Sequence, residues 1–215
     1  MLDVDAQTEY WNRVGPTKPF SHPLAIDRLS HWLPVTRRLV DIGCGYGRTI
    51  QALASVGYQD LVGVDPAPAM AVATRARGVL APIIVGDARC LPLRDRCADA
   101  ALLLAVLTCI PTDEGQRGVL AEIRRILRPG GLLYISDLWL QTDRRNRARY
   151  DRDVGRFGRY GVFALEEGVV VRHHDRAWID ALIAEFSTVE LWPQDVATMS
   201  GNIASGFQWI GRTIF

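Results

Sequence analysis

The feature that most constrains this chain is a short apolar run that passes through alternating glycines into a helical pattern. Residues 39–42 have the character of a buried strand, Gly43, Gly45 and Gly47 follow at alternate positions, and 49–54 begins a helix. Glycine adopts positive φ and lets backbone approach a bound molecule without a Cβ in the way. The first helical turn leaves N–H groups free to donate to an anion. The stretch therefore predicts a ligand site where a strand turns into a helix.

Downstream of this turn, strands and helices alternate. The strands end repeatedly in polar residues, with Asp65, Asp87 and Asp137 each following an apolar run. Nearly continuous apolar strands are typical of a parallel sheet covered on both faces, and ligands bind at the carboxyl ends of such strands. We expect strands over 37–42, 60–64, 82–86, 98–104 and 131–137, and helices over 47–56, 67–76 and 113–128.

Two motifs carry a family resemblance over residues 37–137. Asp41-Ile42-Gly43-Cys44-Gly45-Tyr46-Gly47 and Leu127-Arg128-Pro129-Gly130-Gly131 resemble those of class I S-adenosylmethionine-dependent methyltransferases, in the branch of small single-domain enzymes. The dinucleotide fingerprint G-x-G-x-x-G differs, because Arg48 stands three residues after Gly45. A nicotinamide oxidoreductase is therefore the weaker interpretation.

The resemblance implies an α/β fold with a Rossmann-like, doubly wound, seven-stranded sheet whose last strand is antiparallel. We expect one domain over 1–215, in which a helical lid (1–35) precedes the cofactor-binding core (37–137). A small substrate-cap insertion (138–172) would follow strand 5, before a C-terminal helix and the last two strands (173–215). The expected elements outside the core are helices over 3–13, 23–33 and 177–186, a hairpin of 161–165 with 168–172, and strands over 189–199 and 207–215.

The resemblance also implies S-adenosyl-L-methionine as the cofactor. Asp41 would hold its amino group, Asp65 would accept both ribose hydroxyls, and Asp87 would accept the adenine amino group. An aspartate after a strand can equally be a turn former, and lid aromatics can simply anchor the N-terminal segment. The other implied contacts, from the turn, the adenine wall, the methionine side and the lid, are Gly43, Cys44, Gly45, Pro66, Met70, Gly86, Ala88, Leu104, Ala105, Val106, Tyr10 and Phe20, with Trp11 and His22 as further lid candidates.

The acceptor side is less constrained. His173, His174 and Tyr160 are candidate catalytic residues, because imidazole has a suitable pKa for activating a hydroxyl or thiol. Adjacent strand residues point to opposite faces, so at most one of the two histidines should face the site. Tyr150 and Phe163 could build an aromatic acceptor pocket or merely pack the cap.

Arginines are concentrated between residues 144 and 159. They could bind an anionic acceptor, or they could form a solvated helix face. In the second case Asp143 with Arg147, and Asp153 with Arg149, have the spacing of helical ion pairs.

Composition limits the classes of partner that the chain is expected to bind. A net charge of +1 gives no field that would draw the chain to nucleic acid or membrane. The four cysteines lack zinc-type spacing, so we expect no metal and reduced thiols in the cytoplasm. The N-terminus has no signal-peptide pattern, and the apolar run 100–110 is too short to cross a bilayer. We expect a monomer or homodimer with a small-molecule partner.

The leading function is methyl transfer to an O, N, S or C atom of a small molecule. A nucleic-acid or protein methyltransferase is a rival, although residues 104–107 lack the Asn/Asp-Pro-Pro-aromatic motif of adenine-modifying enzymes. A cyclase or binding module that holds the cofactor without transferring its methyl group is a second rival, since fold does not fix function. Release of S-adenosylhomocysteine distinguishes it from a methyltransferase.

Overall fold

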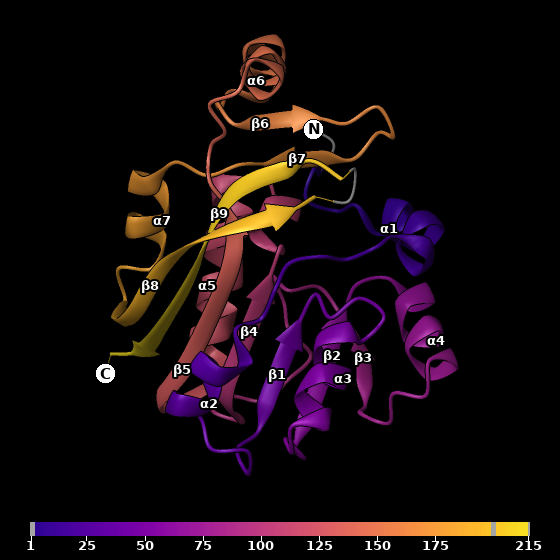
Figure 1. Ribbon diagram of the computed structural model, residues 1–215, viewed down its shortest axis with the longest axis vertical. Coiled ribbons are helices and arrows are strands. Elements are labelled where there is room, and N and C mark those ends of the chain that lie inside the picture. Colours follow the sequence, from indigo (N-terminus) through magenta and orange to yellow (C-terminus); the bar gives the residue numbers. More distant parts are fainter. Residues whose placement is uncertain (1–2, 199–200, 215) are drawn as a thin grey trace.

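The computed structural model describes residues 3–198 and 201–214, and a seven-stranded sheet forms its centre (Figure 1). The strand order is β3-β2-β1-β4-β5-β9-β8. Neighbouring strands among β3, β2, β1, β4 and β5 pair in parallel. Strand β9 runs antiparallel between β5 and β8. The bounds are β1 Leu39–Ile42, β2 Leu61–Asp65, β3 Ile83–Val85, β4 Ala98–Leu104, β5 Leu127–Leu138, β8 Phe186–Ala197 and β9 Ile203–Thr213. The predicted doubly wound sheet with an antiparallel last strand is confirmed.

Helices cover both faces of the sheet because alternate strand residues enter two separate cores. Val40 and Ile42 pack in one apolar cluster with α5 (Asp113–Ile126) and α7 (Arg176–Leu182). Leu39 packs in the other, with α2 (Ile26–Trp32) and α3 (Arg48–Ser55). The remaining helical segments are α1 (Thr8–Val14), α4 (Pro68–Ala76) and the short 3-10 turns η1 (Gly15–Thr17) and η2 (Leu107–Cys109).

The sheet reverses its direction of winding at β1. This strand pairs in parallel with β2 on one side and with β4 on the other. Helices connected to such neighbouring strands diverge to opposite faces, which opens a crevice at the carboxyl ends. The glycine turn after Ile42 lies at this crevice.

Residues 139–175 build a small unit beyond these strand ends. It contains α6 (Arg144–Phe157) and an antiparallel pair, β6 (Val162–Ala164) with β7 (Val170–Arg172), which lie at the top of Figure 1. Asp143 caps α6 by accepting a hydrogen bond from the Asn146 backbone at 3.1 Å, and Gly158 ends it with φ of 69°. A parallel bridge between Trp139 and His174 joins the two ends of the unit.

Several element boundaries differ from those expected. Strand β5 begins at Leu127, inside the range expected to be helical. Helix α7 ends at Leu182 and β8 begins at Phe186, because the buried Phe186 ring packs edge-on against Trp209 with centroids 6.0 Å apart. Helix α1 begins only at Thr8; before it, Asp3 contacts Arg89 at 2.9 Å and Asp5 accepts from the Thr112 backbone at 3.0 Å. The expected strand ends at 199 and 215 lie outside the described residues.

Among the described residues, no helix combines the length and apolar character that crossing a membrane requires.

Candidate active site

A cleft of about 420 Å³ lies at the carboxyl ends of β1, β2 and β4. Every residue that the sequence places at the cofactor lines this cleft. The lining residues come from the N-terminal segment, the glycine turn, the ends of β2 and β4, and the unit that contains α6, β6 and β7. The structure thus brings together side chains that are far apart in sequence.

The glycine turn has the backbone conformation that its sequence predicts. Gly43 and Gly45 have φ of 69° and 54°, a region that residues with a side chain rarely adopt. The packing around Gly43 and Gly45 also leaves no room for a side chain. A Cβ on Gly43 would lie 2.6 Å from Val106, and one on Gly45 would lie 2.8 Å from the ring of Phe20. The turn therefore needs glycine for both its conformation and its close packing.

Asp41 is a buried carboxylate with an unused oxygen. Its Oδ2 atom has no hydrogen-bond partner among the described residues, and 2% of the residue is exposed. Burial raises the pKa of Asp41 to about 7; the Arg48 guanidinium opposes this shift, and Asp65 adds to it. A buried acceptor without a partner is costly. The site therefore suits a cationic donor, such as the ammonium group of an amino-acid moiety.

Asp65 fixes the geometry at the end of β2. Its Oδ2 accepts from the Gly45 backbone at 2.9 Å and its Oδ1 accepts from the Ala67 backbone at 2.9 Å. Burial raises its pKa to about 6, while these two hydrogen bonds oppose the shift. A carboxylate oxygen has two lone pairs, so each still has capacity for a hydroxyl donor. Asp65 therefore acts as a turn former and retains the capacity to bind two hydroxyl groups.

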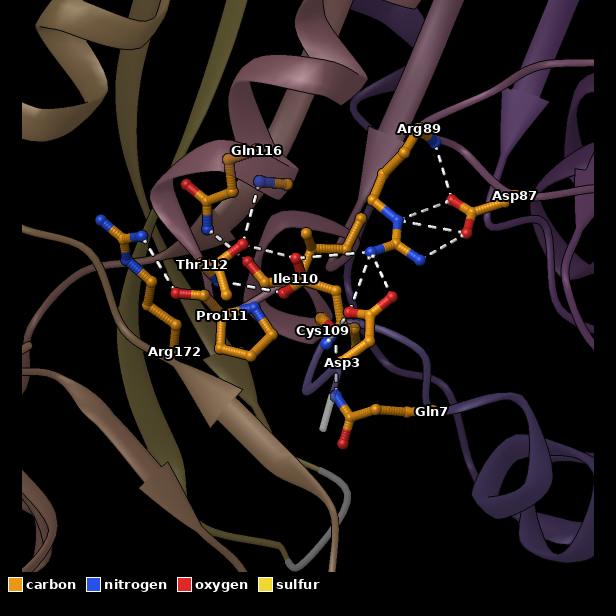
Figure 2. A network of polar contacts seen from close by, with 12 residues as sticks. Asp3, Gln7, Asp87, Arg89, Cys109, Ile110, Pro111, Thr112, Gln116 and Arg172 are labelled. Carbon is orange, nitrogen blue, oxygen red and sulfur yellow. Dashed lines mark hydrogen bonds and ion pairs between the residues drawn. The ribbon is translucent and has the colours of Figure 1, made fainter. Parts of the chain in front are cut away.

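Asp87 lines the cleft but already has a strong partner. Figure 2 shows Arg89 between Asp87 and Asp3. The Arg89 guanidinium contacts both oxygens of Asp87, the closest at 2.7 Å, and it lies 2.9 Å from an Asp3 oxygen. Burial would raise the pKa of Asp87, but the hydrogen bonds from Arg89 lower it overall. This pairing competes with the expected bond from Asp87 to an adenine amino group.

The N-terminal segment closes over the cleft through two sets of contacts. Phe20 stacks on Tyr46, with ring centroids 5.0 Å apart. Glu167, in the turn between β6 and β7, accepts hydrogen bonds from the Tyr10 hydroxyl at 2.7 Å and the Lys18 amine at 2.6 Å. Gln7 exchanges hydrogen bonds of 2.7 Å with the backbone of Val170. The segment is thus linked to the β6–β7 pair across the mouth of the cleft.

Ala105 is a strained residue in the cleft wall. Its φ is 57°, and its backbone N–H donates to the Ser136 carbonyl at 2.8 Å. A left-handed conformation costs a residue with a Cβ roughly 1–2 kcal/mol. Such strain persists where the surrounding structure enforces it, and it is concentrated at functional sites.

His173 lines the cleft, and His174 does not, as strand alternation predicts for neighbouring residues. His173 Nδ1 lies 2.5 Å from the Tyr150 hydroxyl, and Nε2 has no hydrogen-bond partner among the described residues. Burial, followed by the charge of Arg149, lowers the pKa of His173 to about 4. The side chain is therefore neutral at physiological pH.

Two of the proposed catalytic residues lie outside the cleft. The His174 ring is 1% exposed, with Nδ1 3.1 Å from the Leu138 carbonyl and Nε2 2.9 Å from Gln116 Nε2. Burial and Arg172 lower its pKa to about 3, so its 3.6 Å contact with Asp137 is not an ion pair at neutral pH. Tyr160 lies in the turn after α6, is 42% exposed and packs edge-on against Tyr150. These positions correct the expectation that either residue faces the substrate.

His22, a lid candidate from the sequence, lines the cleft, and so do Arg145 and Arg149 from the arginine cluster. Arg48 also lines it, and the sequence did not single out this residue as a site residue. Burial lowers the pKa of His22 to about 4, and its Nδ1 lies 3.4 Å from the Ser136 hydroxyl. Arg48 donates to the His22 carbonyl. For Arg145 and Arg149, the signal in the sequence is their spacing of four, which places them on one face of a helix.

Comparisons with known proteins agree with this geometry. Residues 40–135 match the profile of the methyltransferase domain family. Over 198 residues the chain is 30% identical to the ubiquinone biosynthesis O-methyltransferase of Xanthomonas campestris pv. campestris, covering 88% of this chain and 78% of the relative. The protein of the same description from Xanthomonas oryzae pv. oryzae is 31% identical over 60% of this chain, and the match spans 56% of that relative's length.

A solved structure shares the fold along nearly its whole length. An S-adenosylmethionine-dependent methyltransferase from Methanosarcina mazei superimposes with a TM-score of 0.82 at 25% identity, covering 90% of this chain and 99% of that one. This chain belongs to the class I S-adenosylmethionine-dependent methyltransferase family.

Proposed function

We propose that this chain transfers the methyl group of S-adenosylmethionine to a nucleophilic atom of a small molecule. The observation that carries the proposal is the unpartnered oxygen of buried Asp41, in the same cleft as Asp65. An ammonium group would satisfy the first carboxylate, and a pair of ribose hydroxyls would suit the second. The cofactor supplies an activated methyl group, which leaves by in-line displacement.

The remaining cofactor contacts follow from the cleft wall. Backbone at Gly43, Cys44 and Gly45 would approach the methionine and ribose portions, as would Leu104, Ala105 and Val106 on the other side. Pro66, Met70 and Ala88 would form the apolar wall for adenine, with Gly86 beside them. Tyr10 and Phe20 would close the site from the N-terminal segment. Because Arg89 occupies both Asp87 oxygens, Asp87 would contribute less to adenine binding than the sequence suggests.

On the acceptor side, the protein's contribution would be positioning and exclusion of water. His173 and His22 line the cleft as neutral imidazoles and could hydrogen-bond the acceptor. The acceptor would enter between α6, the β6–β7 pair and the N-terminal segment. Residues 138–172 would then act as a substrate cap.

The setting of the reaction is also part of this proposal. The reaction would take place in the cytoplasm, which the four unpaired cysteines support. Its acceptor would be a small molecule and not a nucleic acid. The Xanthomonas relatives are named for ubiquinone biosynthesis, and we do not extend that role to this chain.

The test is release of S-adenosylhomocysteine from S-adenosylmethionine, measured against a panel of small metabolites. We expect acceptor-dependent release and transfer of a labelled methyl group to the product. If calorimetry detected no binding of S-adenosylhomocysteine, the cofactor assignment would be wrong. Binding without turnover on any acceptor would favour the non-methylating alternative.

A further inference from the structure

Charged side chains line the cleft both at the strand ends and in the unit beyond them. The carboxylates Asp41, Asp65 and Asp87 lie at the ends of the sheet strands, where the cofactor is proposed to bind. Arg145 and Arg149, which come from α6 in the unit beyond the strand ends, line the same cleft, as do Asp5 and Glu167. The two arginines give the cleft cationic groups on a different element from the strand-end carboxylates, which suits a second ligand of negative charge.

The other cations that line the cleft have acidic neighbours. Lys18 forms an ion pair with Glu167 at 2.6 Å. Arg48 lies near enough to Asp41 to oppose the rise of that carboxyl's pKa. Arg145 and Arg149 form no ion pair with any residue in 3–198 or 201–214, although the charge of Asp143 acts on both.

The aspartates expected to neutralise α6 are engaged elsewhere. Asp143 accepts hydrogen bonds from Asn146, through the backbone at 3.1 Å and the side chain at 2.6 Å. Asp153 pairs with its neighbour Arg152 at 2.7 Å, and it also accepts from the Ala164 backbone at 2.9 Å. The pairing of Asp153 with Arg149 that the spacing suggested is therefore absent from the described residues.

Two like charges one helical turn apart repel each other unless a counter-ion lies between them. Burial lowers the pKa of Arg149, and the neighbouring charges of Arg145 and Arg152 lower it further, against smaller opposing effects of Asp143 and Glu166. The repulsion between the two guanidinium groups persists in the protein without a ligand. A bound anion would offset this repulsion.

Arg149 donates a hydrogen bond to Asn146 Oδ1 at 3.4 Å, and its other neighbours in the cleft include apolar residues. Its guanidinium lies 5.5 Å from the centre of the Phe163 ring, and Leu165, Val169 and Val171 line the same part of the cleft. His173 comes directly after β7 and lines the cleft as Val171 does, and its Nε2 has no hydrogen-bond partner within 3–198 and 201–214. An apolar body with an oxyanion at one end would contact all of these groups.

We propose that Arg145 and Arg149 bind an oxyanion of the methyl acceptor, so that the enzyme acts on acidic molecules with an apolar, flat body. A guanidinium matches a carboxylate or a phosphate with two parallel hydrogen bonds. The acidic group would anchor the acceptor at the cap and direct its nucleophilic atom past His173 toward the cofactor end. This inference rests on the proposed function.

The test uses the full chain saturated with S-adenosylhomocysteine, and three probes of similar size: benzoate, phenyl phosphate and benzamide. Calorimetry should show that at least one anion binds about tenfold or more tightly than neutral benzamide. The preferred anion identifies the acidic group as a carboxylate or a phosphate. Arg145→Gln and Arg149→Gln should each remove most of this preference, and Arg149→Lys should keep part of it.

Arg147→Gln is the matched control, because Arg147 is exposed on the same helix and does not line the cleft. It should leave the affinity for the anions unchanged. Equal binding of benzamide and both anions would overturn the proposal, as would an equal loss in the Arg147 variant. The affinity for S-adenosylhomocysteine is measured in every variant, and it should stay constant. Failure of the proposed function would instead abolish that binding in the unmodified protein.

Discussion

The Tyr150 hydroxyl oxygen lies 2.5 Å from Nδ1 of His173, and it also accepts a hydrogen bond from the Gln141 backbone at 3.1 Å. Since the Gln141 N–H points at the phenol oxygen, the Tyr150 proton is free to point at the imidazole. Nδ1 is then the acceptor, and neutral His173 carries its proton on Nε2. The ring therefore presents an N–H donor to the cleft, which suits holding an acceptor oxygen better than removing its proton.

Replacing Tyr150 by phenylalanine should remove the hydrogen bond that sets the tautomer of His173. We expect Tyr150→Phe to reduce kcat/KM for the acceptor about tenfold, because the ring loses the hydrogen bond that fixes its tautomer and orientation. Nitrogen-15 NMR of His173 should show a protonated Nε2 in the unmodified protein and a mixture of tautomers in the variant. Tyr160→Phe is the control, since that hydroxyl lies outside the cleft lining. A protonated Nδ1 in the unmodified protein would contradict this assignment.

Binding of S-adenosylhomocysteine should depend on pH through Asp41. Burial raises the folded-state pKa of this carboxyl to about 7 from its ordinary value of 3.8, so it is largely protonated at pH 6. The ammonium group of the ligand favours the ionised form. Affinity should therefore rise as pH rises, by about tenfold between pH 6 and pH 8, with release of a proton near pH 7.

The same shift affects the stability of the protein without ligand. Because the folded state binds the proton more tightly, the contribution of Asp41 to the free energy of unfolding is present below pH 4 and is lost as pH rises to about 7. Asp41→Asn should remove both effects and leave only the weaker pH dependence from Asp65, whose pKa is about 6. Titrations in buffers of different ionisation enthalpy measure the proton release. An unchanged pH profile in Asp41→Asn would assign the proton to another group.

Asp65 should be more important for ligand affinity than its neighbours at the same sheet edge. We expect Asp65→Ala to weaken binding of S-adenosylhomocysteine at least tenfold, because a two-point hydrogen bond is lost. The structure adds that the variant also loses the hydrogen bonds to Gly45 and Ala67, so thermal unfolding must be measured together with calorimetry. Asp60, at the opposite end of β2, pairs with Arg38, and Asp60→Ala should bind normally. Equal affinities in the two variants would count against the assignment.

The strand-end part of the cleft was predictable from sequence because it depends on local rules. Apolar runs define the strands, and parallel strands place Asp41, Asp65 and Asp87 at one edge. The partner of Asp87 was not predictable in this way. Arg89 follows it by two residues, but the geometry that joins Arg89 to Asp3 depends on tertiary packing of the N-terminal segment.

The acceptor end depended on contacts that sequence spacing does not determine. Helical spacing suggested Asp153 as a partner of Arg149, but Asp153 instead pairs with Arg152 and accepts from the backbone of Ala164 at the end of β6. Alternation of neighbouring extended residues indicated that at most one of His173 and His174 would face the site, but it could not say which of them lines the cleft. That choice follows from Gln116 and Leu138, which hold His174 in the interior.

Replacing Ala105 by glycine tests whether this residue is strained, because strain predicts that the protein becomes more stable. Its φ of 57° should favour glycine, so Ala105→Gly should stabilise the protein by up to about 1 kcal/mol, despite the greater freedom of glycine in the unfolded chain. Ala148→Gly, in the exposed and regular part of α6, should destabilise it by about 1 kcal/mol. For a chain of this size each change corresponds to a shift in Tm of roughly 2–4 °C, in opposite directions. Thermal unfolding by calorimetry measures both variants, and a lower Tm for both would mean that Ala105 is not strained. Since the relieved strain lies in the cleft wall, Ala105→Gly should also loosen that wall and weaken binding of S-adenosylhomocysteine, whereas Ala148→Gly should not.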